Sequence, residues 1–364
     1  MSTAQVRVHF PANGSFHAEL KSRTEEYFEG AGRSRHGGLA MIFKTATFFA
    51  WLGLSWALLV FAPVNAWQAV LLTVSVGLAV AGIGFSVMHD ANHGGYSRNP
   101  RVNRVMSFTL DLVGASSFLW RQKHNLMHHT YTNISGVDAD IETGSPMLRL
   151  APWQPRRKHH RFQHLYVWLL YGLFPIEWWF VDDFRELASG KIAGRSFPKA
   201  RGWELFCTLA GKAIFITWAF AIPVIAHPTW KVVPLFLFGL FVLGNVLAAV
   251  FQLAHCVAEA DFLEAPASGE MKTEWAEHQV NTTVDFARGN RLLGWYLGGL
   301  NFQVEHHLFP RVCHLHYPAL SAIVEKACAA HGIRYRAEPS LRSALSSNLR
   351  WLRLMGSPAP LEAA

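Results

Sequence analysis

The segment QAVLLTVSVGLAVAGIGFSVM occupies residues 68–88, and HDANH follows it directly at His89–His93. An uncharged segment of this length can cross the hydrocarbon core of a bilayer as a helix. His89 and His93 are four residues apart, so a continuing helix turns both imidazoles to one side. Because imidazole is the commonest metal-ligating side chain, the stretch predicts a metal site at the end of a membrane-spanning helix.

Three further segments have the length and apolarity of membrane-spanning helices. Together with 68–88, the predicted spans are residues 39–62, 203–226 and 232–254. Short connections join the first span to the second and the third to the fourth, so the sequence predicts two helical hairpins. Lys44 and Lys212 lie near the opening turns of two spans, where a long side chain is expected to reach the membrane interface. Shorter apolar stretches at 106–120 and 165–181 are predicted to be interfacial or re-entrant helices.

The composition fits a membrane protein with a large polar part. The 364 residues are 51% hydrophobic and 16% charged, whereas soluble domains carry about 25% charged residues. The net charge of +8 fits positive cytoplasmic loops and anionic lipids, and no nucleic-acid-binding motif accompanies it. The four cysteines form no Cys-x-x-Cys pair, which argues against a disulfide framework or a zinc–thiolate site.

The distribution of basic residues predicts the orientation in the membrane. The segment 89–201 contains fifteen Lys and Arg residues, whereas the two hairpin loops contain only Lys231. The positive-inside rule therefore places this segment and both termini in the cytoplasm. His89 follows the second span and His255 follows the fourth, so all histidine clusters are expected on one side of the membrane, in a helical cap.

Two more histidine clusters follow the first one. They are HNLMHH at His124–His129 and QVEHH at Gln303–His307. The candidate metal ligands are thus His89, His93, His124, His128, His129, His255, His306 and His307. Eight imidazoles exceed one tetrahedral site and suit two metal ions. Imidazole binds Zn, Cu, Fe and Ni alike, so the donor type alone leaves the metal open.

Polar side chains beside these histidines are candidate partners for the outer ring N–H groups. They are Asp90, Asp140, Gln303 and Glu305, with Asp138 and Glu142 close to Asp140. Such partners fix the tautomer of a ligating histidine and raise its basicity. Asp90 and Glu305 are favoured because they lie inside the clusters, whereas solvated loop carboxylates are the alternative for the others.

The three clusters together resemble the histidine boxes of the integral-membrane fatty acid desaturases. The resemblance extends to Thr130–Asn133 and to Gly298–Phe302, which flank the second and third boxes. A glutamine at the start of the third box, here Gln303, resembles the pattern of the front-end desaturases. These enzymes add a double bond between an existing double bond and the carboxyl end of the chain. The resemblance implies an all-α fold of four transmembrane helices in two hairpins, with the cytoplasmic cap holding a di-iron site.

By this resemblance the eight histidines hold two non-haem irons, and O2 is the co-substrate. Gln303 stands where many relatives have histidine, so it is expected to orient a water or make an outer hydrogen bond. The resemblance covers residues 39–331, the expected desaturase domain, between a cytoplasmic N-terminal segment (1–38) and a C-terminal tail (332–364). No haem motif of a fused cytochrome b5 domain occurs in this sequence, so electrons are expected from a separate ferredoxin or cytochrome.

The predicted function is oxygen-dependent desaturation of a fatty acyl chain, with front-end regiochemistry. A hydroxylase or acetylenase on the same metal centre is the nearest alternative. A metal transporter or haem carrier is disfavoured, because it needs polar residues deep in the spans. The substrate is either a coenzyme A ester or a membrane lipid. Arg121, Lys123 and the run at Arg156 suit either the phosphates of coenzyme A or the anchoring of the cap to anionic lipids. Chain length, double-bond position and oligomeric state are left open.

Several further histidines lie outside the boxes. His159, His160 and His164 lie within or next to a basic run and are expected at lipid headgroups. His278 is a weaker candidate for an approach to the metals, and His314 is expected near the site or at the surface.

Overall fold

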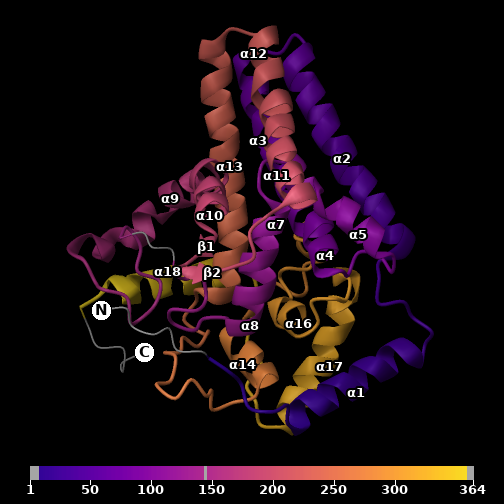
Figure 1. The fold of residues 1–364 in the computed structure, drawn as a ribbon, viewed down its shortest axis with the longest axis vertical. Helices are drawn as coiled ribbons and strands as arrows, with labels where there is room; N and C mark the ends of the chain where they lie inside the picture. The colour runs from indigo at the N-terminus through magenta and orange to yellow at the C-terminus, as the bar shows by residue number, and fades with distance from the viewer. Residues whose placement is uncertain (1–7, 143–145, 359–364) are drawn as a thin grey trace.

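The computed structural model describes residues 8–142 and 146–358 and is mostly helical (Figure 1). Four of its helices are long and apolar enough to cross a membrane. They are α2 (Gly38–Phe61), α3 with η1 and α4 (Ala66–Ile83, Gly84–Met88, His89–His93), α11 with η5 and α12 (Gly202–Ile216, Thr217–Ala221, Ile222–Ala226), and α13 (Thr229–His255). The four apolar segments predicted from the sequence coincide with these helices. The second helix continues through η1 and α4, so His89 and His93 lie on an extension of the span itself.

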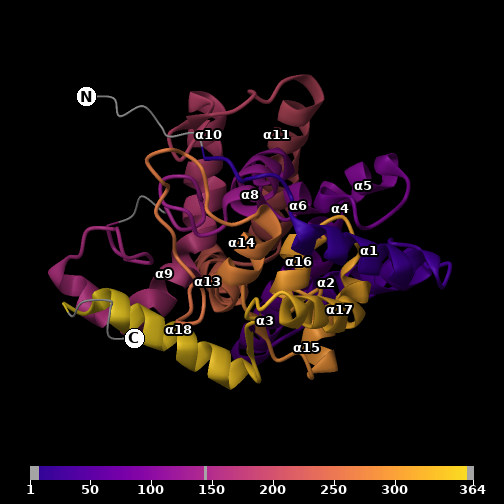
Figure 2. The same ribbon diagram turned by 90° about the horizontal axis from the view of Figure 1, so that it is seen from below.

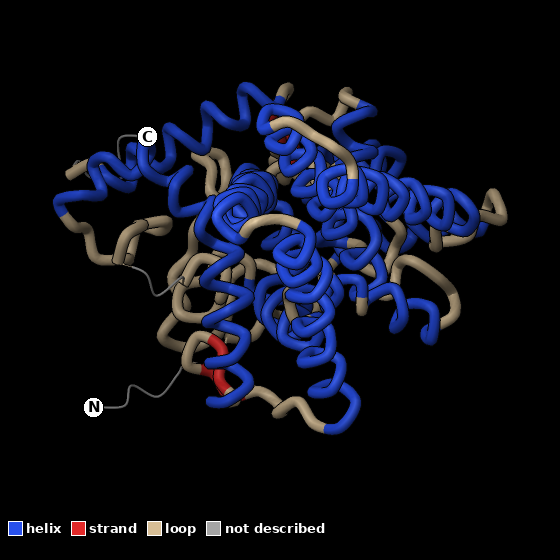
Figure 3. The backbone as a smooth tube through the Cα atoms, turned by 90° about the horizontal axis from the view of Figure 1, so that it is seen from above, coloured by secondary structure: helices blue, strands red, loops and turns tan. Residues whose placement is uncertain are grey.

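The remaining elements are short and gather mainly at the lower end of the long helices (Figures 1 and 2). The helices are α1 (Ser15–Glu29), α5 (Pro100–Ser107), α6 (Thr109–Leu112), α7 (Ser117–Trp120), η2 (Arg121–His128), α8 (His129–Tyr131), η3 (Lys158–Phe162), α9 (Gln163–Glu177), η4 (Trp178–Asp182), α10 (Asp183–Ser189), α14 (Trp275–Thr282), α15 (Arg291–Tyr296), α16 (Gln303–Leu308), η6 (His314–His316), α17 (Tyr317–Ala330) and α18 (Leu341–Gly356). The strands pair as β1 (Lys191–Ile192) with β2 (Arg195–Ser196), antiparallel, and β3 (Asp285–Phe286) with β4 (Ala337–Glu338), parallel. Figure 3 shows how small the strands, in red, are beside the helices, in blue.

Close helix packing depends on glycine at several crossings. A Cβ on Gly82 of α3 would lie 2.1 Å from the Phe48 ring of α2, and one on Gly77 would lie 3.3 Å from the carbonyl oxygen of Gly239 in α13. On the other side of α13, a Cβ on Gly244 would lie 2.3 Å from the carbonyl oxygen of Tyr171 in α9. Helix α3 therefore packs between α2 and α13, and α9 lies against α13.

The segment expected to be a C-terminal tail is integrated into the fold. Strand β4 pairs with β3, and α18 buries Trp351, Leu352 and Met355 against Leu150 and neighbouring apolar residues. Helix α1 of the predicted N-terminal segment likewise packs on α17 through Phe16. Residues 1–7 and 359–364 of the two predicted terminal segments lie outside the described residues.

Lys44 and Lys212 differ from the sequence prediction, since both side chains are buried rather than extended to an interface. Lys44 Nζ lies 2.8 Å from His314 Nε2, and Lys212 Nζ lies 2.8 Å from Asp183 Oδ2. Each amine thus contacts a polar side chain that is distant in the sequence. A buried ammonium is tolerated only with such a partner, because the bare charge loses its hydration.

The loop before the third box is fixed by one close backbone contact. Gly298 has φ +61°, and a Cβ there would lie 2.2 Å from the carbonyl oxygen of Phe85 in η1. Glycine is thus required both by the left-handed conformation and by the space. The contact holds the loop leading to α16 against the helix that carries the first box.

Candidate metal centre

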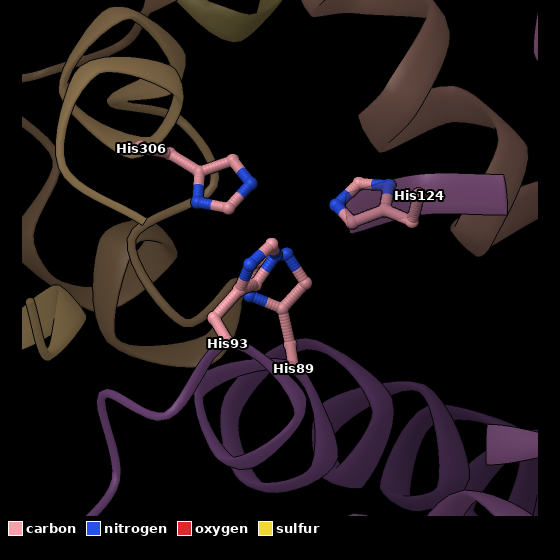
Figure 4. Close-up of side chains that lie close together, drawn as sticks. All are labelled: His89, His93, His124 and His306. Carbon is pink, nitrogen blue, oxygen red and sulfur yellow. The ribbon is translucent and has the colours of Figure 1, made fainter. Parts of the chain in front are cut away.

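Four histidines from three separate parts of the chain form one buried group, which we call the first group. His89 and His93 come from α4, His124 from η2 and His306 from α16, and their ligand atoms all lie within 4.8 Å of one another. Figure 4 shows the four rings turned toward a common point. The ring centroids of His89 and His306 are 4.4 Å apart, although 217 positions separate them in the sequence (306 − 89).

Three more histidines form a second group beside the first. His128, His255 and His307 again have ligand atoms within 4.8 Å of one another, and all three are buried. His129 lies between the groups: its Nε2 is 2.9 Å from His306 Nε2, and its ring stacks on that of His307 with centroids 4.2 Å apart. All eight histidines that the sequence singled out therefore converge in one buried region.

The second box is divided between the groups because its helix has π-helical geometry. A π-helix pairs residues five apart, which brings the rings of His124 and His129 together. His128 instead points its Nε2 to His255, at 3.3 Å. The α-helical spacing assumed from the sequence identifies the same residues but does not assign them to the two groups.

The donor set suits bound cations. Nε2 of His89, His93 and His307 is buried without a hydrogen-bond partner among the described residues. Buried polar atoms are almost always satisfied, so an unpaired inward-facing nitrogen requires an explanation. Burial, reinforced by neighbouring imidazoles, lowers the pKa of His124, His129, His306 and His307 well below its ordinary value. These rings are neutral, and neutral imidazole offers the lone pair that a metal needs.

His128 has a carboxylate behind it, as the sequence suggested for this region. Its Nδ1 lies 3.1 Å from Asp138 Oδ2 and 3.5 Å from Asp140 Oδ2. Burial opposes the imidazolium, but the Asp138 and Asp140 carboxylates outweigh it and raise the pKa of His128 to about 9. Asp138 is fully buried, whereas 40% of the Asp140 side chain is exposed. Of these two candidate carboxylates, Asp138 is therefore the closer partner of His128, whereas Asp140 is the more solvated one.

This pair gives a matched test. The variant Asp138→Asn is expected to lower activity or metal affinity about 10–100-fold, the usual cost of losing an outer-shell partner. Asp140→Asn is expected to cost much less, because that carboxylate is farther away and solvated. Metal content and product formation of both purified variants check this. Equal losses in the two variants would contradict the assignment of Asp138.

Asp90 and Glu305 do not have the partners expected from the sequence. Asp90 Oδ2 accepts from the Nδ1 and backbone N–H of His314, at 2.8 and 3.2 Å, whereas His89 Nδ1 is 3.9 Å from Asp90 Oδ1. Lys44 completes a buried chain through His314. These contacts tie the first box to α2 and η6 rather than orienting a ring of the box directly.

Glu305 belongs to a separate acidic network behind the third box. Tyr335 Oη lies 2.9 Å from Glu305 Oε1 and 2.5 Å from Asp285 Oδ2. Burial, with the neighbouring Asp285 carboxylate, raises the pKa of Glu305 well above its ordinary value. Asp285 also accepts the backbone N–H of Val304 at 3.0 Å. The network thus holds the backbone of α16 and contacts none of the eight rings.

Three further side chains lie within hydrogen-bond distance of the rings. Gln303 Nε2 lies 2.9 Å from His255 Nε2, so the amide points into the second group. Gln279 Oε1 lies 2.8 Å from His307 Nδ1, and Tyr317 Oη lies 3.3 Å from His306 Nδ1. The sequence analysis missed Gln279 and Tyr317, because neither belongs to a box and only the tertiary fold brings them near.

The other polar residues singled out from the sequence lie outside both groups. His278 is buried but its Nε2 lies 2.9 Å from the carbonyl oxygen of Thr132. His159 and His160 both approach the carbonyl oxygen of Pro146. Arg121 forms an ion pair with Glu204, and Lys123 forms one with Glu186. Both cations are therefore already neutralised within the fold.

Comparison with known proteins supplies the family. The fatty acid desaturase family model matches residues 65–339, which include all three boxes and His255. This chain belongs to the fatty acid desaturase family. It is similar to the sn-1 linoleoyl-lipid 6-desaturases of Synechocystis sp. (38% identical, covering 98% of this chain and 99% of the relative) and Arthrospira platensis (36%, covering 98% and 96%). An acyl-lipid (8-3)-desaturase of Physcomitrium patens is 35% identical, covering 94% of this chain and 72% of the relative.

These relatives confirm the prediction of a front-end fatty acid desaturase made from the boxes. The desaturase is accordingly an oxidoreductase of lipid metabolism, and the four long helices make it an integral membrane protein. Its buried histidine groups are compatible with a metal site.

Proposed function

We propose that the desaturase inserts a double bond at position 6 of a linoleoyl chain carried by a membrane lipid, at a di-iron centre. The position and carrier follow the names of its relatives from Synechocystis sp. and Arthrospira platensis, which it matches over nearly its whole length. The reaction balances as –CH2–CH2– + O2 + 2 e⁻ + 2 H⁺ → –CH=CH– + 2 H2O. The observation that carries this proposal is the convergence of eight buried histidines, seven in two adjoining groups and His129 between them.

The proposal gives each histidine group one iron. The first group, His89, His93, His124 and His306, would hold one iron. The second group, His128, His255 and His307, would hold the other, with Gln303 beside it and His129 between the two. Removal of hydrogen from an unactivated methylene needs a redox-active metal, which excludes zinc and favours iron among metals bound by imidazole. When bound, the irons would supply the activation of O2.

The proposed role of the protein side chains is to orient the histidine rings and the acyl chain; they do not themselves react. Asp138 and Gln279 accept hydrogen bonds from the outer nitrogens of His128 and His307, which fixes the tautomer that presents Nε2 inward. The eight histidines are at most 8% exposed, so bulk solvent has little access to their rings. No general base is required, so desaturation depends on holding one C–C bond next to the metals, where a small displacement is costly.

A lipid-bound acyl chain is favoured over a coenzyme A ester. The relatives from Synechocystis sp. and Arthrospira platensis are named for lipid-bound chains, and Arg121 and Lys123 are already held by Glu204 and Glu186. The cap and both termini are proposed to face the cytoplasm, on the basis of the fifteen basic residues in 89–201. Two electrons per turnover would come from a ferredoxin or cytochrome.

The test is product analysis in a host whose membrane lipids contain linoleoyl chains but no 6-unsaturated ones. Expression of the desaturase should produce lipids with a new double bond at position 6, located by mass spectrometry, and purified protein should contain two irons and no haem. The alternative, a hydroxylase or acetylenase, would give hydroxylated chains or a triple bond instead. A new alkene at another position would reject the proposed regiochemistry alone.

A further inference from the structure

One face of the cap carries exposed arginines that have no acidic partner. Three segments make up this face, which we call the arginine surface: residues 30–37, 94–104 and 311–316. Its exposed arginines are Arg33, Arg35, Arg98, Arg101, Arg104 and Arg311. None of the three segments contains Asp or Glu, and none of the six arginines forms an ion pair within the described residues.

Direct contacts join the three segments. The backbone N–H of Cys313 donates to the carbonyl oxygen of Arg35 at 2.8 Å, and His36 Nδ1 lies 3.3 Å from the carbonyl oxygen of Gly95. Gly95 in turn lies against the backbone of Val312, where a Cβ would approach to 3.2 Å. Figure 2 shows the surrounding helices α1, α4, α5, α16 and α17 on one side of the molecule.

The arginine surface differs from other basic regions in gathering six unpaired arginines on joined segments. Among the described residues some other cations, such as Arg121 and Lys123, are paired with carboxylates, whereas isolated ones on α18 are not. The acids that come nearest along the chain, Glu26 and Glu29, belong to α1. A cluster of unpaired like charges raises the local potential and attracts an anionic partner.

A short series of side chains leads from this surface to the first histidine group. The guanidinium of Arg33 lies 4.5 Å from the Tyr27 ring centre, and that of Arg35 lies 5.2 Å from the Phe28 ring centre. Phe28 is buried in one apolar cluster with Tyr317. Tyr317 Oη lies 3.3 Å from His306 Nδ1. Two buried aromatic rings therefore separate the exposed arginines from a histidine of the candidate metal centre.

We propose that the arginine surface is the docking site of an acidic one-electron carrier protein, and that electrons enter the metal centre past Tyr317 at His306. The proposal rests on the proposed function, since it assumes a redox-active centre. Each reduced carrier is oxidised by one electron and the centre gains it, so two docking events supply the two electrons of the balanced reaction. The basic charge provides steering and orientation of the carrier.

The test compares two charge-reversal variants with the same net change. Arg33→Glu/Arg35→Glu alters the arginine surface, and Arg342→Glu/Arg353→Glu alters exposed arginines on α18, well away from α1 in Figure 2. Stopped-flow spectroscopy follows reduction of the iron-loaded enzyme by a reduced plant-type ferredoxin or, separately, a soluble cytochrome b5 domain. For at least one carrier we expect the first variant to react about tenfold more slowly and with a weaker dependence on salt. The α18 variant should resemble the unaltered enzyme.

Dithionite separates the possible failures. Reduction by this small reductant should be unchanged in both variants, and the dithionite-reduced enzyme should form alkene with O2. Equal carrier-driven rates in the unaltered enzyme and the Arg33→Glu/Arg35→Glu variant would overturn the docking proposal. The proposal would also be overturned if this variant, tested separately with phosphatidylserine vesicles, lost only vesicle binding and kept its carrier-driven rate. Failure of the dithionite-reduced, unaltered enzyme to form alkene would instead reject the proposed function.

Discussion

Replacement of His128 by alanine is expected to abolish desaturation, with a loss of more than about 100-fold, because even outer-shell partners are worth 10–100-fold. His128 Nε2 faces His255 in the second group, and its other nitrogen is fixed by Asp138. The substitution removes one of three imidazoles from that group. Product yield and iron content of the purified variant measure the effect, and iron should fall toward one per chain.

A matched control shows whether the effect is specific to His128 or follows from replacing any histidine. His17 lies on α1, outside both groups, so His17→Ala should retain full activity and full iron content. His128→Ala protein that is folded, as shown by an unchanged melting temperature in detergent, yet inactive and iron-poor would support the ligand role. Full activity in the His128→Ala variant would refute it.

Local sequence patterns were sufficient to predict the spans and the boxes. The length of an apolar segment determines whether it can cross a bilayer as a helix. The segment 68–88, for example, meets this condition without reference to any other part of the chain. The four-residue spacing of His89 and His93 likewise depends only on helix geometry. Such features need no knowledge of the rest of the fold, and they located all eight histidines that the structure brings together.

The partners of those residues depend on tertiary contacts and were not predictable. Asp90 lies beside His89 in sequence but bonds His314, which is 224 positions away. Gln279 and Tyr317 reach the rings only because α14 and α17 pack on α16. The division of the second box between the two groups arises from the π-helical turn of η2, which has no signature in a single sequence.

Lys212 shows the same limit inside a membrane-spanning helix. A lysine near the end of an apolar helix is expected to extend to the interface, since that costs little. The structure turns it inward because Asp183, in α10, offers a buried carboxylate. Its ammonium also donates to the carbonyl oxygens of Gly114 and Trp179, at 3.0 and 2.7 Å. All three of its protons are thereby used, so the buried charge is fully hydrogen-bonded.

Lys212→Met is therefore expected to destabilise the desaturase by about 3–5 kcal/mol, the cost of breaking a buried ion pair by removing one partner. The variant leaves Asp183 buried with only the backbone N–H of Ser116, at 3.0 Å, on the oxygen that Lys212 contacted. Thermal unfolding in detergent measures the loss, and Lys191→Met, at an exposed site in β1, serves as the control.

The double variant Lys212→Met/Asp183→Asn should recover much of the lost stability. An asparagine oxygen can still accept the Ser116 N–H, and no uncompensated charge then remains in the interior. The recovery distinguishes a buried charge from a loss of packing, because a packing defect at Lys212 would persist in the double variant. If Lys212→Met melts like the unaltered protein, the amine contributes no stability and an interfacial position, as first predicted, is the better description.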